Sequence, residues 1–358
     1  MNVEEHPADD LLGLTEALVA IPSVHPDESA IADAVERRLR RSAALTVDRV
    51  RNNVVARTHL GRDRRVVLGG HLDTVPPAGN ERPRRDGEVL WGLGSADMKG
   101  SVAVLLALAG AVGEDANHDL TFILYEGEEV AEAHNGLRVL FAEKPDLVAC
   151  DLAVLMEPTG GCVEAGCQGT IHLRATVHGA RAHTARPWTG RNAVHAAVPI
   201  LDRLAAFEAE TVEVDGLEYR ESLQVVALQA GVRPNVVPDE CHITVNRRFA
   251  PSRTLDEALA ETTALLDGAD AIEMLNESVA APPNLSHPLV AEFVKSLDVP
   301  VRPKLGWTDV ARFAAAGIPA LNFGAGDPEV AHTADECVEG SELRRVRDAL
   351  GAFLGVAG

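Results

Sequence analysis

Short apolar runs alternate with segments of helical periodicity through the first 165 residues. Residues 65–70 (RVVLGG), 120–125 (LTFILY) and 152–156 (LAVLM) are continuous apolar runs, typical of strands that are buried on both faces of a sheet. Apolar residues recur at helical spacing in 27–41, and 99–112 is an Ala/Leu/Val-rich helix. This alternation predicts an α/β layer architecture with a mainly parallel sheet.

The pattern changes after about residue 166 and changes back near Pro282-Pro283. Residues 170–178 (TIHLRATVH) alternate apolar and polar, which suits a sheet with one exposed face. The order of the elements that follow is β-α-β-β-α-β, as in a ferredoxin-like unit. The predicted helices are 192–208 and 254–267, and the further strands are 222–230, 240–249 and a strand near 271–275.

The α/β pattern then resumes with a helix at 287–296, a helix start near Thr308-Asp309, a strand at 320–323 and a final helix from Ser341. The simplest organisation is one catalytic domain, residues 1–166 and 280–358, interrupted by a smaller inserted domain at 167–279.

Several predicted strands end on residue types that bind metal ions. In open parallel sheets, functional side chains gather beyond the carboxyl ends of the strands, so these residues are expected to share one focus. The residues that follow strands are His71 and Asp73 after 65–70, Glu128 and Glu129 after 120–125, Glu157 after 152–156, and His332 beyond 320–323; Asp97 precedes the helix 99–112.

Each of these residues also has an ordinary structural interpretation. An isolated His-x-Asp is usually a hydrogen-bonded pair, Asp97 could be a helix N-cap, and Glu128-Glu129 alone would be a solvated turn. His332 alone would be structural. The joint pattern is more specific: histidine and carboxylate ligands without cysteine favour a catalytic zinc site over a structural one.

Charge and cysteine content narrow the class of protein. The 54 Asp+Glu against 33 Lys+Arg give a formal charge of −21, which disfavours nucleic-acid and anionic-membrane surfaces. Five cysteines without a CxxC pair indicate reduced thiols. The polar, acidic start resembles no secretory signal, and the longest apolar stretch, 102–112, is too short to span a bilayer. We therefore expect a cytoplasmic protein.

Along essentially its whole length the sequence resembles the co-catalytic zinc aminoacylase/carboxypeptidase family of metallopeptidases. The stretches that carry the resemblance are GGHLDTVP (69–76), WGLGSADMKG (91–100), GEE (127–129), MEP (156–158), GARAHTARP (179–187) and the late His332. It implies a zinc-peptidase-like catalytic domain and an inserted ferredoxin-like lid that forms a homodimer.

The resemblance also assigns roles to the residues of the catalytic domain. It implies two Zn²⁺ ions per chain, or Co²⁺ in their place, with Asp97 bridging them. Asp73 would orient His71, and Glu128 would be the general base that takes a proton from the attacking water. In this family the peptide bond after the bridging aspartate is typically cis, here Asp97-Met98. The implied ligands are His71 and Glu157 on one ion, Glu129 and His332 on the other, and Asp97 on both.

In the inserted domain the resemblance makes His183 an oxyanion donor that reaches the active site of the partner subunit. Asn235 and Arg248 match residues that bind a substrate carboxylate, a task to which arginine is well suited. Thr308 and Asp309 match a loop on the substrate side.

The substrate implied is N-succinyl-LL-2,6-diaminopimelate, because residues 164–170, 192–195 and 304–313 look most like one branch of the succinyl-diaminopimelate desuccinylases. Another branch carries Arg-Arg where this chain has Cys167-Gln168, so the missing cation would have to come from elsewhere, for example Arg181, Arg186 or Arg191.

Three alternatives stay open. The chain could be another acyl-amino-acid deacylase of the family, such as an acetylornithine deacetylase or a glutamate-type carboxypeptidase. A dinucleotide-binding enzyme is disfavoured because Asp97 stands where a third glycine would be needed after Gly92 and Gly94. A binding protein that has lost catalysis is disfavoured because every expected ligand and the base are present.

Overall fold

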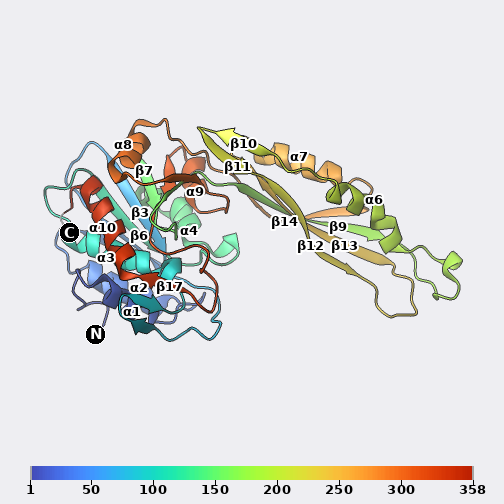
Figure 1. The fold of residues 1–358 in the computed structure, drawn as a ribbon, viewed down its shortest axis with the longest axis horizontal. Coiled ribbons are helices and arrows are strands. Elements are labelled where there is room, and N and C mark those ends of the chain that lie inside the picture. Colours follow the sequence, from blue (N-terminus) through green and yellow to red (C-terminus); the bar gives the residue numbers. More distant parts are fainter. Residues whose placement is uncertain (1, 357–358) are drawn as a thin grey trace. The chain divides into compact units, whose positions relative to one another are not determined.

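The computed structural model describes residues 2–356, which divide into two compact units (Figure 1). The first unit contains the described residues up to Ala165, Asn284–Arg302, and those from Arg312 onwards. The second contains Gly166–Pro283 and Pro303–Ala311. The chain therefore leaves the first unit to build most of the second, returns at Asn284, and contributes the short segment Pro303–Ala311 to the second unit before its last return.

The first unit is built on an eight-stranded sheet with the order β1-β2-β6-β3-β7-β16-β8-β15. Its centre, β6-β3-β7-β16, is parallel, and the pairs β1–β2, β2–β6 and β16–β8 are antiparallel. The register pairs His71 of β3 with Tyr125 of β6, and Gly69 of β3 with Leu155 of β7. The carboxyl ends of these three strands therefore lie side by side. The strands are β1 (Thr46–Val50), β2 (Asn53–Arg57), β3 (Arg65–His71), β6 (Asp119–Tyr125), β7 (Leu152–Leu155), β8 (Val163–Ala165), β15 (Val301–Pro303) and β16 (Ala320–Asn322).

Helices cover this sheet, and α3 is the most deeply buried of them. Its Ala/Leu/Val composition leaves almost no polar face, and it packs against α1, α2 and α10 in the main hydrophobic core. A small antiparallel sheet, β17-β5-β4, lies beside α1 and α10. The elements are α1 (Leu11–Val19), α2 (Ser29–Leu39), α3 (Gly100–Ala111), α4 (Gly136–Glu143), α5 (Pro145–Val148), α8 (Pro288–Leu297), α9 (Val310–Ala315), α10 (Gly340–Leu354), β4 (Arg84–Asp86), β5 (Val89–Trp91) and β17 (Cys337–Glu339).

The second unit is an antiparallel sheet, β12-β13-β9-β14, with α6 and α7 on one face (Figure 1). Residues of β13 alternate between buried and half-buried because every second side chain faces the helices. A separate hairpin, β10–β11, completes the unit. The elements are β9 (Gly169–His178), α6 (Ala193–Ala205), β10 (Thr211–Val214), β11 (Leu217–Arg220), β12 (Ser222–Ala230), β13 (Glu240–Phe249), α7 (Leu255–Leu265) and β14 (Ala271–Ser278).

The predicted fold class is confirmed: a mainly parallel α/β layer and an α+β unit with the order β-α-β-β-α-β. The sequence did not predict α1, α4, α5, β8 or β15, nor the short strands of β1–β2, the β17-β5-β4 sheet and the β10–β11 hairpin. These strands are three to five residues long and many of their positions are polar, so they lack the apolar run that marks a buried strand. Among the described residues, no helix is both long and apolar enough to cross a membrane.

Candidate metal centre

The end of β3 packs directly against the segment that carries Asp97. A Cβ atom at Gly70 would lie 2.7 Å from the Cε atom of Met98, so a larger residue there would displace the Met98 side chain. The backbone N–H of His71 donates to the Met98 sulfur at 3.3 Å. The Asp97-Met98 peptide bond is cis, as the resemblance implied.

Asp97 lies between two histidines, and each of its carboxylate oxygens faces one of them. Oδ1 is 3.0 Å from His71 Nε2, and Oδ2 is 3.4 Å from His332 Nε2. His332 Nε2 is also 2.8 Å from Glu129 Oε1. The ligand atoms of His71, Asp97 and Glu157 all lie within 4.8 Å of one another, and so do those of Asp97, Glu129 and His332. The structure thus brings together all five residues expected as ligands, in two groups that share Asp97.

The carboxylates of this cluster stabilise the protonated, positively charged forms of His71 and His332. Burial would lower the pKa of His71, but the hydrogen bond and charge of Asp97 outweigh it and hold that pKa well above its ordinary value. Hydrogen bonds to Asp97 and Glu129 raise the pKa of His332 to about 10. Against the cost of burial, hydrogen bonds from His332 and His71 lower the pKa of Asp97. The carboxylates therefore favour positive charge on both rings.

Asp73 contacts both sides of the cluster. Its backbone carbonyl accepts from His71 Nδ1 at 3.0 Å, whereas its carboxylate is 3.6 Å from that nitrogen. The two carboxylate oxygens instead accept the backbone N–H groups of Glu128 and Glu129, at 3.0 and 2.9 Å. Asp73 therefore orients the His71 ring through its main chain and the Glu128-Glu129 turn through its side chain.

The Glu128-Glu129 turn itself depends on a glycine. Gly127 has φ +68°, and a Cβ atom there would lie 2.4 Å from the carbonyl oxygen of His134. Ligand atoms of Glu128, Glu129 and His71 lie within 4.8 Å of one another, so the expected base sits beside the cluster.

Glu336 is a residue of this site that the sequence analysis missed. Its side chain is 1% exposed, and it accepts the backbone N–H groups of Gly94, Ala96 and Asp97 at 2.8, 3.0 and 2.9 Å. The available signal was its position four residues after His332, but a glutamate in the polar stretch AHTADE reads as solvated.

The candidate residues of the second unit fall into two groups at opposite ends of its sheet. His183 and Asn235 are exposed on neighbouring segments, where the Thr184 N–H donates to the Asn235 carbonyl at 3.2 Å. Arg248 is half-buried at the far end of β13. There Thr308 is 4% exposed, and its carbonyl accepts the Cys167 thiol at 3.8 Å.

The neighbouring arginine of β13 has a different environment. Arg247 is 1% exposed and forms an ion pair with Glu221 at 2.7 Å, on the face of the sheet that the helices cover. Strand alternation therefore separates a structural arginine from Arg248, which lies on the open face.

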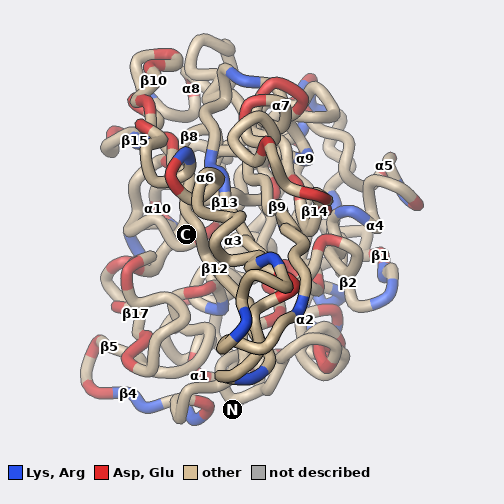
Figure 2. The backbone as a smooth tube through the Cα atoms, turned by 90° about the vertical axis from the view of Figure 1, so that its right-hand side faces the viewer, with Lys and Arg blue, Asp and Glu red and all other residues tan. Residues whose placement is uncertain are grey.

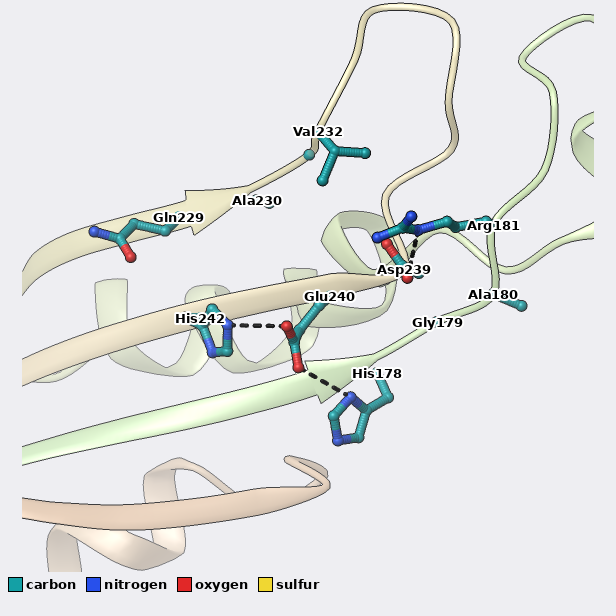
Figure 3. Close-up of a pocket in the computed structure, with 11 residues that line it drawn as sticks. His178, Gly179, Ala180, Arg181, Gln229, Ala230, Val232, Asp239, Glu240 and His242 are labelled. Atoms are coloured by element: carbon teal, nitrogen blue, oxygen red, sulfur yellow. Dashed lines mark hydrogen bonds and ion pairs between the residues drawn. The ribbon is translucent and has the colours of Figure 1, made fainter.

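An open cavity of about 690 Å³ lies at one end of the second unit's sheet, where His178, Arg181 and Glu240 are among the residues that line it (Figure 3). Along its wall Glu240 contacts His178 at 3.5 Å and His242 at 3.2 Å. Arg181, one of the three arginines considered as the missing cation, donates to Asp239 at 2.7 Å in the same cavity. Arg186 and Arg191 are exposed.

A further cation lies at the other end of the sheet. Lys304 and Arg248 are both close enough to the Cys167 thiol to act on it electrostatically. Cys167 is one of the two residues that stand where the other branch has its arginines, so two cations act electrostatically on that position.

The donor set at the cluster fits a pair of borderline divalent cations. Two imidazoles and three carboxylates converge, one carboxylate is shared, and no cysteine takes part. The direct histidine–carboxylate contacts join atoms that would each offer a lone pair to a cation placed between them.

Comparison with known proteins agrees with this architecture. The model of Peptidase family M20/M25/M40 matches residues 67–355. The succinyl-diaminopimelate desuccinylase of Corynebacterium glutamicum is 46% identical over 367 aligned positions, covering 99% of this chain and 100% of that protein. A DapE protein of Mycobacterium tuberculosis is 47% identical over 348 positions, covering 97% and 98%.

Solved structures share the fold at low sequence identity. The aminopeptidase PepT of Bacillus cereus superposes with a TM-score of 0.81 at 18% identity, covering 97% of this chain and 98% of that one. A tripeptidase of Staphylococcus aureus gives a TM-score of 0.79 at 20% identity, with the same coverage of 97% and 98%.

Proposed function

The chain belongs to Peptidase family M20/M25/M40, and from that premise we propose that it hydrolyses the amide bond of N-succinyl-LL-2,6-diaminopimelate. The main support for hydrolytic chemistry is the position of Asp97, whose two carboxylate oxygens face His71 and His332. The choice of substrate is supported by the C. glutamicum desuccinylase, which matches from end to end at 46% identity.

We infer that two Zn²⁺ ions, or Co²⁺ in their place, are the cofactors. His71 and Glu157 would hold one ion, Glu129 and His332 the other, and Asp97 both. When bound, such ions polarise the amide carbonyl and lower the pKa of water. Two ions would also supply the positive charge that this carboxylate-rich cluster favours.

Glu128 is the proposed general base. It would accept a proton from the attacking water and pass it to the nitrogen as the C–N bond breaks. The water oxygen leaves in succinate, and diaminopimelate leaves with the new N–H. The Asp73 carboxylate supports this role because it fixes the backbone of both Glu128 and Glu129.

We propose that two chains complete one another's sites. Glu240 and Arg248 are eight residues apart on β13, a span of about 26 Å at roughly 3.3 Å per residue. His183 and Asn235 lie near the Glu240 end, because Gly179 N–H donates to Asp239 and Thr184 N–H to Asn235. A small acyl-amino acid cannot contact both groups of one chain, so His183 and Asn235 would act in the partner's site, whereas Arg248 and Thr308 would act in their own.

The edge strand β12 offers the surface for this dimer. Among the described residues it has one neighbouring strand, β13, and an exposed edge strand tends to pair with another chain. Val225, Val226 and Leu228 on β12 are 39%, 57% and 50% exposed, so pairing with a second copy would cover apolar surface.

Arg248 and Lys304 are the proposed binders of a substrate carboxylate. Succinyl-diaminopimelate carries three free carboxylates, more than acetylornithine does, so a second cation near Arg248 favours the desuccinylase over the deacetylase. Lys304 would thus replace the arginines absent at Cys167-Gln168.

The deciding experiment compares rates on N-succinyl-LL-diaminopimelate, N-acetylornithine and a glutamyl peptide with the same enzyme sample. We expect a clear preference for the first, loss of that activity after chelation, and its return with Zn²⁺ or Co²⁺. A preference for either other substrate would replace the proposed substrate, and activity that is indifferent to chelation would reject the metal cofactor.

A further inference from the structure

Two loops that meet at the candidate metal centre are joined by one buried residue. The first loop, residues 92–97, ends on Asp97, and the second, residues 327–336, carries His332. Glu336 closes the second loop just before β17 and is 1% exposed. We propose that Glu336 is a positioning residue that sets the distance between the shared ligand Asp97 and His332, an inference that rests on the proposed metal-dependent function.

The Glu336 carboxylate is used entirely in holding the first loop. Oε2 accepts the Gly94 N–H at 2.8 Å, and Oε1 accepts those of Ala96 and Asp97 at 3.0 and 2.9 Å. Gly94 has φ +77°, a conformation that turns its N–H toward the carboxylate, and a Cβ atom there would lie 2.7 Å from Thr74 Cγ2. One side chain therefore fixes the backbone on which Asp97 is mounted.

The main chain reinforces the same junction. The Glu336 carbonyl accepts the Gly92 N–H at 3.0 Å, and Asn80 donates to the Thr333 carbonyl at 3.0 Å while its own carbonyl accepts the Leu93 N–H at 2.8 Å. His332 adjoins Thr333 and has φ +63°, a backbone conformation uncommon for a non-glycine residue, so its loop needs such external support. Moving Glu336 would shift both ligands.

The test replaces Glu336 by Gln, which has the same shape. Gln can accept at one oxygen only, and its NH₂ group would face a backbone N–H of Gly94 or of Ala96 and Asp97. Mutation of a residue that orients a metal ligand typically weakens metal binding by about 10–100-fold. We expect Glu336→Gln to bind zinc about 10–100-fold more weakly in a chelator competition, and the visible spectrum of its cobalt form to change.

The matched control is Asp119→Asn. Asp119 is also a buried carboxylate of the first unit with three hydrogen bonds, from Thr58 Oγ1 at 2.8 Å and the N–H groups of Leu60 and Arg62 at 2.7 and 3.0 Å. It lies at the opposite end of β6 from the metal centre. We expect this variant to lower the unfolding midpoint while zinc affinity and the cobalt spectrum stay those of the unsubstituted chain.

Glu336→Asp keeps the charge and draws the carboxylate back, so its zinc affinity should lie between those of the unsubstituted chain and Glu336→Gln; it decides the matter if the Gln variant does not fold. Unchanged zinc affinity and cobalt spectrum in the Glu336 variants would overturn the inference. Equal losses in Asp119→Asn would overturn it too, because they would indicate general destabilisation. If the unsubstituted chain takes up no metal, the proposed cofactor fails first and Glu336 loses its role with it.

Discussion

Carboxylates in and around the cluster have different roles, as candidate metal ligands or as acceptors that hold the backbone, because their hydrogen-bond partners differ. Asp97 contacts one histidine with each oxygen, whereas Asp73 spends both oxygens on backbone N–H groups. Glu336 does the same from outside the cluster. Chemically similar side chains thus divide into candidate ligands and supports according to whether backbone donors already occupy their oxygens.

Metal uptake should release protons. In the metal-free protein the pKa of His332 is about 10 and that of His71 is well above its ordinary value, so both rings are protonated at pH 7. A ligand must be deprotonated to bind, so two ions should displace about two protons, and affinity should rise with pH. Calorimetric titration with zinc at pH 7 in buffers of different ionisation enthalpy measures the number; no proton release would contradict the shifted pKa values.

Residues that directly follow a buried strand were predictable from the sequence. His71 and Glu157 come at the ends of runs whose apolar character already placed them at one sheet edge. The contacts of Asp73 were not predictable, because His-x-Asp permits either its carbonyl or its carboxylate to meet the histidine. Glu336 was missed because its donors come from a loop about 240 residues earlier in the chain.

At the scale of elements, the strand period separates functions that the sequence leaves mixed. In β13, Arg247 faces the helices and pairs with Glu221, whereas Arg248 lies on the open face. The same strand also separates the His183 and Asn235 group from the Arg248 and Thr308 group by its length. The facing of the two arginines and the separation of the two groups both follow from where β13 starts and ends, and not from side-chain identity alone.

Arg248→Met should weaken substrate binding. Loss of a charge-assisted contact to a carboxylate costs about 1.5–3 kcal/mol, so KM should rise roughly 10–100-fold while zinc content stays unchanged. Arg174→Met is the control, since Arg174 is a half-buried arginine of the neighbouring strand β9 whose partner is Glu273 at 3.3 Å. Steady-state rates on the succinylated substrate decide; equal KM values for both variants would remove Arg248 from the substrate site.

Charge placed on the β12 edge should dissociate the dimer. Val226→Asp introduces a carboxylate at a position that is 57% exposed in the single chain and would be covered by the second copy. Ile272→Asp is the control, on the opposite edge strand β14, where Ile272 is 39% exposed. Light scattering coupled to size exclusion should show a monomer for Val226→Asp alone; a dimer in both variants would move the interface elsewhere.

At the scale of the whole molecule, the net charge is acidic although the proposed substrate site contains cations. The formal charge of −21 is spread over the chain (Figure 2). In the second unit, for example, acidic residues lie along α7 and β14, among scattered basic residues. Such a surface disfavours polyanions but does not exclude a small anionic substrate, because Arg248 and Lys304 provide positive charge locally.

Mixing two inactive variants should restore activity if His183 acts across the dimer. Glu128→Gln removes the base and His183→Ala the oxyanion donor, and each homodimer should turn over poorly while retaining its zinc. A mixed dimer contains one intact site, so random exchange of equal amounts should restore about a quarter of the unsubstituted activity. Rates measured after co-refolding test this; no recovery despite confirmed exchange would place His183 in its own chain's site.

The interrupted first unit has a consequence for how the protein is made. Four of the five candidate ligands are translated by Glu157, but His332 follows only after the second unit. At about 5–20 residues per second, a ribosome needs roughly 10–35 s to cover that interval. During that time the nascent chain contains an acidic metal site that lacks His332. Glu336, which accepts the Asp97 N–H, is synthesised later still. Stable metal capture would then report that the second unit has already been synthesised.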